Sequence, residues 1–306
     1  MRKLPVLVAL AAAATLALSG CTDASQTGAT SGSDDSSSPA PTFDLSSIQK
    51  DDAAAKLLPA DVAASGKLTV GTDTTYAPAE FIDPDGKTPV GYDIDLIDAV
   101  AAVLGLDAEP QTAEFPSIIP GLGSKYDVGI SSFTITPERL ESANMVSYFS
   151  AGEAYAVPKG NPEKLTVDDI CGMTVTVQNG TIQDDEVDDI STKCESDGKD
   201  PLKVLNYDSQ ADATTNVVGG KADVMFADSP IVQYAVTQTD GQLEQLGDTF
   251  SSAPQGIAVA KDDEDLAKAI QAALQVLMDD GDMTKILDVW GASDGALDTA
   301  ELNPAS

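Results

Sequence analysis

The chain has 306 residues, of which 17 are basic and 50 acidic, so its formal net charge is −33, and it contains no histidine. This acidity excludes the basic surface of a nucleic-acid-binding protein and is typical of a soluble, self-repelling surface. The lack of histidine excludes Ser/His/Asp hydrolysis, Cys/His nucleophiles and histidine-bearing zinc sites.

The N-terminus has the pattern of a secretion signal. Arg2 and Lys3 precede an apolar run over residues 4–18, and small residues stand directly before Cys21. At about fifteen residues the run is shorter than the roughly 20 that span a bilayer, and no later stretch is longer. The pattern resembles a bacterial lipoprotein signal, in which residues 1–20 are removed and Cys21 is lipidated; the alternative is ordinary secretion with an incidental cysteine. We expect an extracytoplasmic protein that a lipid anchor holds at the cell membrane.

Residues 22–42 are rich in Ser, Thr, Asp, Gly and Pro and have no aromatic or bulky aliphatic side chain to bury. This composition predicts a disordered tether with a reach of about 25 Å. We expect residues 21–61 to hold the tether and a leading helix.

Two cysteines remain in the body of the chain after Cys21 is assigned to the signal. Cys171 and Cys194 form an even pair in a protein exported to an oxidising compartment, which predicts a disulfide bond. Closing a loop of about 24 residues would stabilise the fold by about 3 kcal/mol.

Strands and helices alternate along the body of the chain. Apolar runs predict strands, and Ile94, Ile97, Ala101 and Leu104 recur at helical spacing before Gly105 ends that helix. The expected elements are strand 68–70, helix 94–104, strand 128–130, strand 173–177, strand 224–226 and helix 266–278. The alternation predicts an α/β fold with parallel sheets, and about 240 folded residues exceed a typical single domain.

Small polar residues follow four of the expected strands. They are Thr72 to Thr74, Ser131 with Ser132, Gln178 to Thr181, and Asp228. Ligands of open α/β sheets bind outside the carboxyl ends of the strands, so these clusters are expected to converge. Each cluster alone could be a helix cap or a turn. Together they offer hydroxyls, amides and carboxylates but no general base, metal cluster or phosphate loop, which favours binding a small zwitterion over converting it.

Six ordered motifs resemble a known family. They are Asp73–Pro78 with Gly91–Leu96, Phe115–Leu122, Ser131–Arg139, Val177–Thr181, Asp223–Asp228, and Trp290 with Gly291. Through them the chain resembles the bacterial extracellular solute-binding proteins of family 3, the polar amino acid receptors of ABC importers. The resemblance implies a two-lobed, type II periplasmic-binding-protein-like α/β fold with two hinge strands. It places lobe 1 at residues 62–152 plus 255–300, lobe 2 at 153–254 and a tail at 301–306.

The resemblance also assigns the residues that recognise the backbone atoms of a bound amino acid. Arg139 would clamp the carboxylate, for which a planar guanidinium is suited, and Asp228 would take the ammonium. The alternative for Arg139 is an exposed arginine on a surface helix. The remaining contacts are expected from Thr134, the backbone around Ser132, and the amides of Gly180 and Thr181.

Three further residues are assigned to the ligand side chain. Tyr76 and Phe115 match aromatic positions that flank it, although Phe115 could equally be a core residue. Asp73 matches a position that meets the far end of the side chain in receptors for cationic amino acids and for glutamine, so it does not separate the two. Ala79 stands where the family commonly has phenylalanine. One wall of the pocket is therefore expected to be roomier or to be filled by a residue from elsewhere in the chain.

The function implied is capture of a polar amino acid, cationic or glutamine/glutamate, and its delivery to the permease of an ABC importer. We expect a monomer that is not an enzyme and has no cofactor. We also expect no metal, because residues 83–86 lack the ligands of a calcium loop and predict a turn. Two alternatives stay open: a dehydratase-like enzyme acting on a small cyclic acid, and a sensory module that signals the ligand state.

Overall fold

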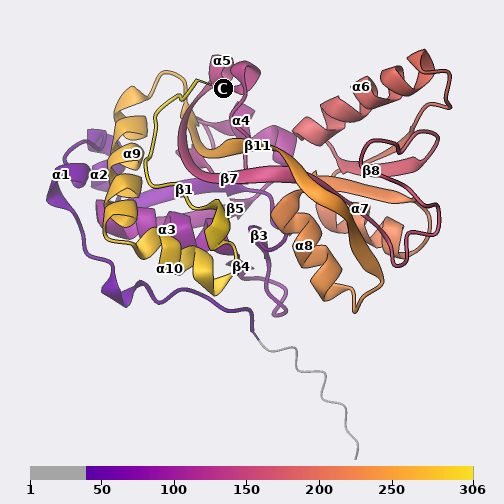
Figure 1. Cartoon of the computed structure of the whole chain (residues 1–306). Coiled ribbons are helices and arrows are strands. Elements are labelled where there is room, and N and C mark those ends of the chain that lie inside the picture. The colour runs from indigo at the N-terminus through magenta and orange to yellow at the C-terminus, as the bar shows by residue number, and fades with distance from the viewer. Residues whose placement is uncertain (1–38, 306) are drawn as a thin grey trace, which may run out of the picture. The chain divides into compact units, whose positions relative to one another are not determined.

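The computed structural model describes residues 39–305 (Figure 1). The predicted signal, the predicted lipidation site Cys21 and most of the predicted tether lie outside the described residues. Residues 39–305 belong to one compact unit. Within the described range, no helix is both long enough and apolar enough to cross a membrane.

The first described residues pack against the body of the protein. The backbone N–H of Ala40 donates to Asp83 at 2.7 Å, and that of Phe43 donates to Asp95 at 2.9 Å. Short helical segments follow: η1 (Leu45–Ser47), α1 (Asp52–Ala55) and α2 (Ala60–Ser65). The end of the predicted tether is therefore docked onto the fold.

Eight strands form one sheet in the order β5-β1-β6-β11-β7-β10-β8-β9, and three short strands form another in the order β2-β3-β4. The eight are β1 (Lys67–Thr72), β5 (Asp107–Thr112), β6 (Val128–Gly129), β7 (Ala143–Pro158), β8 (Thr174–Gln178), β9 (Lys203–Tyr207), β10 (Val224–Asp228) and β11 (Leu243–Ala260). The three are β2 (Thr75–Tyr76), β3 (Glu80–Ile82) and β4 (Pro89–Val90). Strands β5, β1 and β6 are parallel, as are β10, β8 and β9.

Strands β7 and β11 join the two parallel groups. They have 16 and 18 residues, well above the roughly 5 or 6 of an average strand, and they pair antiparallel along their length. One end of the pair joins β6 and the other joins β10. Their register shifts around Phe250, midway between the two groups. This arrangement confirms the predicted two-lobed α/β fold with two hinge strands (Figure 1).

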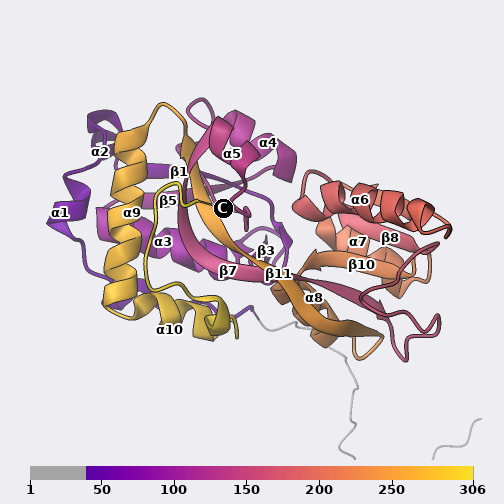
Figure 2. The same ribbon diagram turned by 45° about the horizontal axis from the view of Figure 1, so that its top comes forward.

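Helices cover both lobes (Figure 2). The first lobe has α3 (Tyr92–Leu104), α4 (Phe115–Gly121), α5 (Pro137–Ser142), α9 (Glu264–Asp279), α10 (Asp282–Val289) and η2 (Ser293–Gly295). The second has α6 (Ile182–Ser196), α7 (Gln210–Val218) and α8 (Ser229–Gln238). The predicted strands and helices correspond to β1, α3, β6, β8, β10 and α9, and α3 ends at Gly105 with a φ of 73°.

The central strands are buried on both faces. In β10, Val224 and Phe226 belong to one apolar cluster, while Met225 and Ala227 belong to another on the opposite face. Double burial is typical of parallel sheets covered by helices, and it leaves the carboxyl ends of the strands as the place for polar side chains.

The predicted disulfide is confirmed. Cys171 and Cys194 are bonded, with their Cα atoms 5.6 Å apart and 23 positions apart in sequence. The bond joins α6 to the loop that precedes β8, so it lies within the second lobe.

Candidate ligand-binding site

A small cavity lies where the polar ends of β6, β8 and β10 meet α4, α5 and the N-terminus of α6. The closed lobes leave about 10 Å³ of free volume in it. Its lining residues are Tyr76, Phe115, Ser131, Ser132, Thr134, Arg139, Thr181, Ile182, Gln183 and Asp228. Both lobes contribute to this wall, as the predicted convergence of strand ends requires.

The structure brings the nine predicted site residues together. Seven of them line the cavity, and Asp73 and Gly180 lie directly behind it. Asp73 accepts a hydrogen bond from the backbone N–H of Phe115 at 3.1 Å, and the carbonyl of Gly180 accepts one from Arg139 at 3.0 Å. The sequence-based assignment therefore selected one spatial cluster.

Arg139 bridges the two lobes. Its Nη1 donates to the carbonyl of Thr134 at 2.8 Å, and its Nη2 donates to the carbonyl of Gly180. The Cζ atom lies 5.4 Å from the ring centre of Phe115 and 5.6 Å from that of Phe133. Burial lowers the pKa of Arg139, and the charge of nearby Asp228 opposes that effect, so the guanidinium stays a cation.

Asp228 is a buried carboxylate at the end of β10. Its Oδ1 accepts from Gln183 Nε2 at 2.9 Å and its Oδ2 from Gln255 Nε2 at 2.8 Å. Burial raises the pKa of Asp228 to about 6, while its hydrogen bonds and Arg139 act in the opposite direction. The Tyr76 hydroxyl accepts from the Asp228 backbone N–H at 3.3 Å and is neutral, because burial raises its pKa well above the usual value.

Asp73 is held by four donors and does not line the cavity. Its Oδ1 accepts from the N–H and the hydroxyl of Thr75, and its Oδ2 accepts from Phe115 N–H and from Gln178 Nε2 at 2.8 Å. Burial raises the pKa of Asp73, and these bonds work against the rise. A ligand that reaches Asp73 would take the place of the Gln178 amide.

Ser132, around which a backbone contact to the ligand is expected, is hydrogen-bonded to α3. Its backbone N–H donates to Asp93 at 2.9 Å. Ser132 lines the cavity with its remaining groups, and its φ of 50° is unusual for a residue other than glycine.

Gly180 allows the lobes to approach closely. Its φ is 74°, and a Cβ at this position would lie 3.1 Å from Pro116 of the other lobe. Hydrogen bonds from Gln178 to Asp73, from Arg139 to Gly180, and from Gln210 N–H to Thr75 also cross between the lobes. The structure therefore shows the lobes closed on each other.

The sequence reasoning missed two glutamines that hold Asp228. Gln183 lies buried in the first turn of α6, and its place two positions after the predicted Thr181 was a usable signal in the sequence. Gln255 is a buried polar residue near the middle of β11, and nothing in the local sequence separates it from a surface-facing strand residue.

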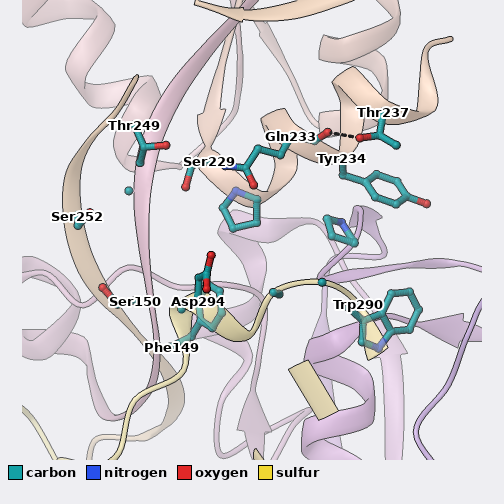
Figure 3. A pocket seen from close by; sticks show the side chains of 16 residues that line it. Phe149, Ser150, Ser229, Gln233, Tyr234, Thr237, Thr249, Ser252, Trp290 and Asp294 are labelled. Atoms are coloured by element: carbon teal, nitrogen blue, oxygen red, sulfur yellow. Dashed lines mark hydrogen bonds between the residues drawn. The ribbon is translucent and has the colours of Figure 1, made fainter. Parts of the chain in front are cut away.

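A larger hollow lies at the hinge, among α8, η2 and the middle of β7 and β11 (Figure 3). Both general views place the hinge strands between α8 on one side and α4, α5 and the start of α6 on the other (Figures 1 and 2). We call it the hinge groove; its free volume is about 480 Å³. Its labelled lining residues are Phe149, Ser150, Ser229, Gln233, Tyr234, Thr237, Thr249, Ser252, Trp290 and Asp294. Its lining includes one carboxylate and no cation, so it has no partner for a ligand carboxylate.

The fold and cavity define a two-lobed solute-binding protein. Residues 68–293 match the sequence profile of the bacterial extracellular solute-binding proteins, family 3. The chain belongs to this family.

Several relatives are named for the amino acid that they bind. The chain is 36% identical over 249 residues to the arginine-binding protein ArgT of Corynebacterium glutamicum, covering 81% of each chain. It also resembles the solved structure of an ancestral arginine-binding protein bound to arginine, with a TM-score of 0.69, 35% identity and coverage of 74% and 98% of the two chains. A structure of an ancestral arginine-binding protein bound to glutamine matches with a TM-score of 0.68, 35% identity and the same coverage.

Proposed function

We propose that this protein captures an amino acid by lobe closure and delivers it to the permease of an ABC importer, and that arginine is the amino acid it prefers. The observation that carries the proposal is the presence of Arg139 and Asp228 in the wall of one small closed cavity. A guanidinium and a carboxylate are the partners that an α-carboxylate and an α-ammonium require.

A ligand carboxylate would give Arg139 stronger hydrogen bonds than those it makes in the closed structure. In the closed structure its Nη1 and Nη2 donate to the carbonyl oxygens of Thr134 and Gly180, which are neutral acceptors. A ligand carboxylate would replace neutral acceptors by a charged one, and charge-assisted bonds are about twice as strong. The ligand would also keep the lobes together, because Arg139 already touches both.

The balance of charge favours a cationic ligand. Arg139 is one positive charge, and Asp228 and Asp73 are two carboxylates in or behind the wall. Burial raises both carboxyl pKa values, because loss of water disfavours their charged forms. A ligand with a net positive charge offsets the second of these carboxylates, whereas glutamine leaves it uncompensated.

The far end of an arginine has a place to bind. Asp73 Oδ2 now accepts from the Gln178 amide, a neutral donor from the second lobe. A ligand guanidinium that displaced this amide would form a charge-assisted pair with Asp73, flanked by Tyr76 and Phe115. The arginine-binding relatives support this assignment, and the glutamine complex makes glutamine the principal competitor.

The remaining expectations concern the setting of the protein. We propose that Cys21 is lipidated and that the protein is a monomer. We also propose that lobe 1 spans residues 62–152 plus 255–300 and that lobe 2 spans residues 153–254. Replacing Cys21 by serine should release the protein from membranes into the medium, and retention of the variant at the membrane would contradict the anchor.

Thermal unfolding in the presence of each of the twenty amino acids tests the proposed function. A ligand that binds only the folded state raises stability by RT ln(1 + [L]/Kd), about 4 kcal/mol at a thousandfold excess over Kd. We expect the largest shift with arginine. A shift with no amino acid would refute the proposal, and consumption of a small cyclic acid would favour the dehydratase alternative.

A further inference from the structure

Two fully buried carboxyl groups lie behind the wall of the cavity. Glu80 is on β3 and Asp93 is in the first turn of α3, and both are 0% exposed. The backbone N–H of Asp93 donates to the carbonyl of Ala79, the residue before Glu80, at 2.9 Å, and each carboxyl group affects the pKa of the other. The titratable groups that act on the pair are Asp73, Tyr92 and Tyr148, none of which is a cation.

The hydrogen bonds around Glu80 have a defined direction. The backbone N–H of Asp73 donates to Ser131 Oγ at 3.0 Å. The hydroxyl hydrogen of Ser131 is therefore free to donate to Glu80 Oε1, which lies 2.7 Å away. Glu80 Oε1 is an acceptor, and only its second oxygen can carry a proton without breaking this chain.

Asp93 accepts from the other serine. The backbone N–H of Ser132 donates to Asp93 Oδ2 at 2.9 Å, and the Ser132 hydroxyl lies 3.3 Å from the same oxygen. The other oxygens of the two acids, Glu80 Oε2 and Asp93 Oδ1, have no hydrogen-bond partner among residues 39–305, and neither has the buried hydroxyl of Tyr148. Two neighbouring buried carboxylates repel each other unless one of them carries a proton.

We propose that Glu80 and Asp93 share one proton at neutral pH, and that the pair positions the Ser131–Ser132 segment in the wall of the amino acid cavity. Glu80 is the neutral acid, which donates to the Asp93 carboxylate. The positioning part of this inference rests on the proposed function, because it concerns the same cavity.

The assignment of the proton to Glu80 agrees with the surroundings of each group. Asp93 lies at the N-terminus of α3 and accepts from Ser132, both of which favour its charged form. Burial and the Asp93 charge raise the pKa of Glu80 well above its usual value, while burial raises the pKa of Asp93 to about 6. Glu80 therefore keeps its proton to a higher pH than Asp93 does.

The pair has a direct path to the ligand. Ser131 and Ser132 both line the cavity, and Ser132 has a φ of 50°, a conformation that needs outside support. Asp93 supplies that support through the Ser132 N–H. Through Ser131, Glu80 also fixes the backbone of Asp73. The carboxylate of Asp73 is the proposed partner of the ligand side chain.

Variants at position 80 test both parts. Glu80→Gln keeps the pattern of the neutral acid, because its amide oxygen can accept from Ser131 and its amide nitrogen can donate to Asp93. Glu80→Ala removes both bonds and leaves buried groups unpaired. We expect Glu80→Ala to weaken arginine binding by about tenfold or more, and Glu80→Gln to bind within about threefold of the natural protein. The control is Asp98→Ala, on α3 but outside the cavity, which should bind arginine as the natural protein does.

Melting temperature against pH tests the shared proton without any ligand. A raised pKa in the folded state means that folding stability is greatest below the unfolded value, near 4.3, and falls as the pH rises toward the folded value. We expect the melting temperature of Glu80→Gln to be near that of the natural protein at pH 4.5 and to rise progressively above it from pH 5 to 8. The unfolding equilibrium constants of the two proteins should diverge by up to about tenfold per pH unit.

The two measurements fail in different ways. Parallel melting curves for Glu80→Gln and the natural protein from pH 5 to 8 would overturn the shared proton. Equal arginine affinity for Glu80→Ala and the natural protein would overturn the positioning role. If the natural protein binds no amino acid, the proposed function fails, and the melting series still decides the state of the pair.

Discussion

The two hollows of this protein differ in size and in chemistry. The hinge groove has a free volume of about 480 Å³ against about 10 Å³ for the small cavity, yet its lining holds no cation and one carboxylate, Asp294. The small cavity holds Arg139 and Asp228 and is crossed by hydrogen bonds between the lobes. Opposed charges on two closing walls, and not volume, identify the place where a zwitterion would be held.

The largest expected effect comes from removing the cation of the cavity. Arg139→Ala should weaken arginine binding on the order of 100-fold or more, because truncating one partner of a buried charge pair typically costs 2–5 kcal/mol. Isothermal titration calorimetry measures the loss. Lys285→Ala removes an exposed cation outside both hollows and should bind normally. Unchanged affinity in Arg139→Ala would remove the cavity as the site.

The second expectation is a dependence of affinity on pH that arises in the cavity. The raised pKa of Asp228, about 6, means that the empty site takes up a proton below pH 6. A ligand ammonium must expel that proton, so arginine affinity should fall by up to about tenfold per pH unit below 6. Asp228→Asn should bind weakly and with a flatter profile. A natural protein with constant affinity from pH 4.5 to 7 would contradict this role.

A smaller loss of affinity should distinguish recognition of the ligand side chain from recognition of the ligand backbone. Asp73→Asn removes the charge behind Phe115 while keeping an acceptor for its N–H. We expect arginine affinity to fall about tenfold and glutamine affinity to stay within about twofold, because only arginine carries the second positive charge. Parallel losses for both ligands in calorimetric titrations would assign Asp73 a purely structural role.

The smallest effect is expected in the hinge groove. Gln233 is an exposed residue of α8 that lines the groove (Figure 3). Gln233→Ala should leave arginine affinity within about twofold, as substitutions at exposed positions commonly do. A tenfold loss would mean that the groove, not the cavity, contacts the amino acid.

Much of the fold could be read from periodicity and turn residues. The helix expected over residues 94–104 ends at Gly105 because that glycine takes a left-handed conformation, and the apolar strands are buried on both faces. The polar clusters converge because parallel strands share one carboxyl edge. The signal for Arg139 is also compositional: the chain has two arginines, and the other is Arg2.

The remaining features of the site depend on contacts between distant segments. Gln255 reaches Asp228 from 27 positions away, and Gln178 reaches Asp73 across 105 positions. Which side chains donate hydrogen bonds to a buried carboxylate depends on how the lobes close. The local sequence does not contain this information. The same reason explains why Asp73 lies behind the wall instead of in it.

Calorimetric titration of the purified protein with arginine and with citrulline tests the central claim most directly. Citrulline has nearly the shape of arginine, but its side chain is neutral. The charge balance of the closed cavity predicts one arginine per chain, bound about thirtyfold more tightly than citrulline or better. Equal affinities for the two would show that the cavity does not select its ligand by charge, and no binding of either would contradict the account as a whole.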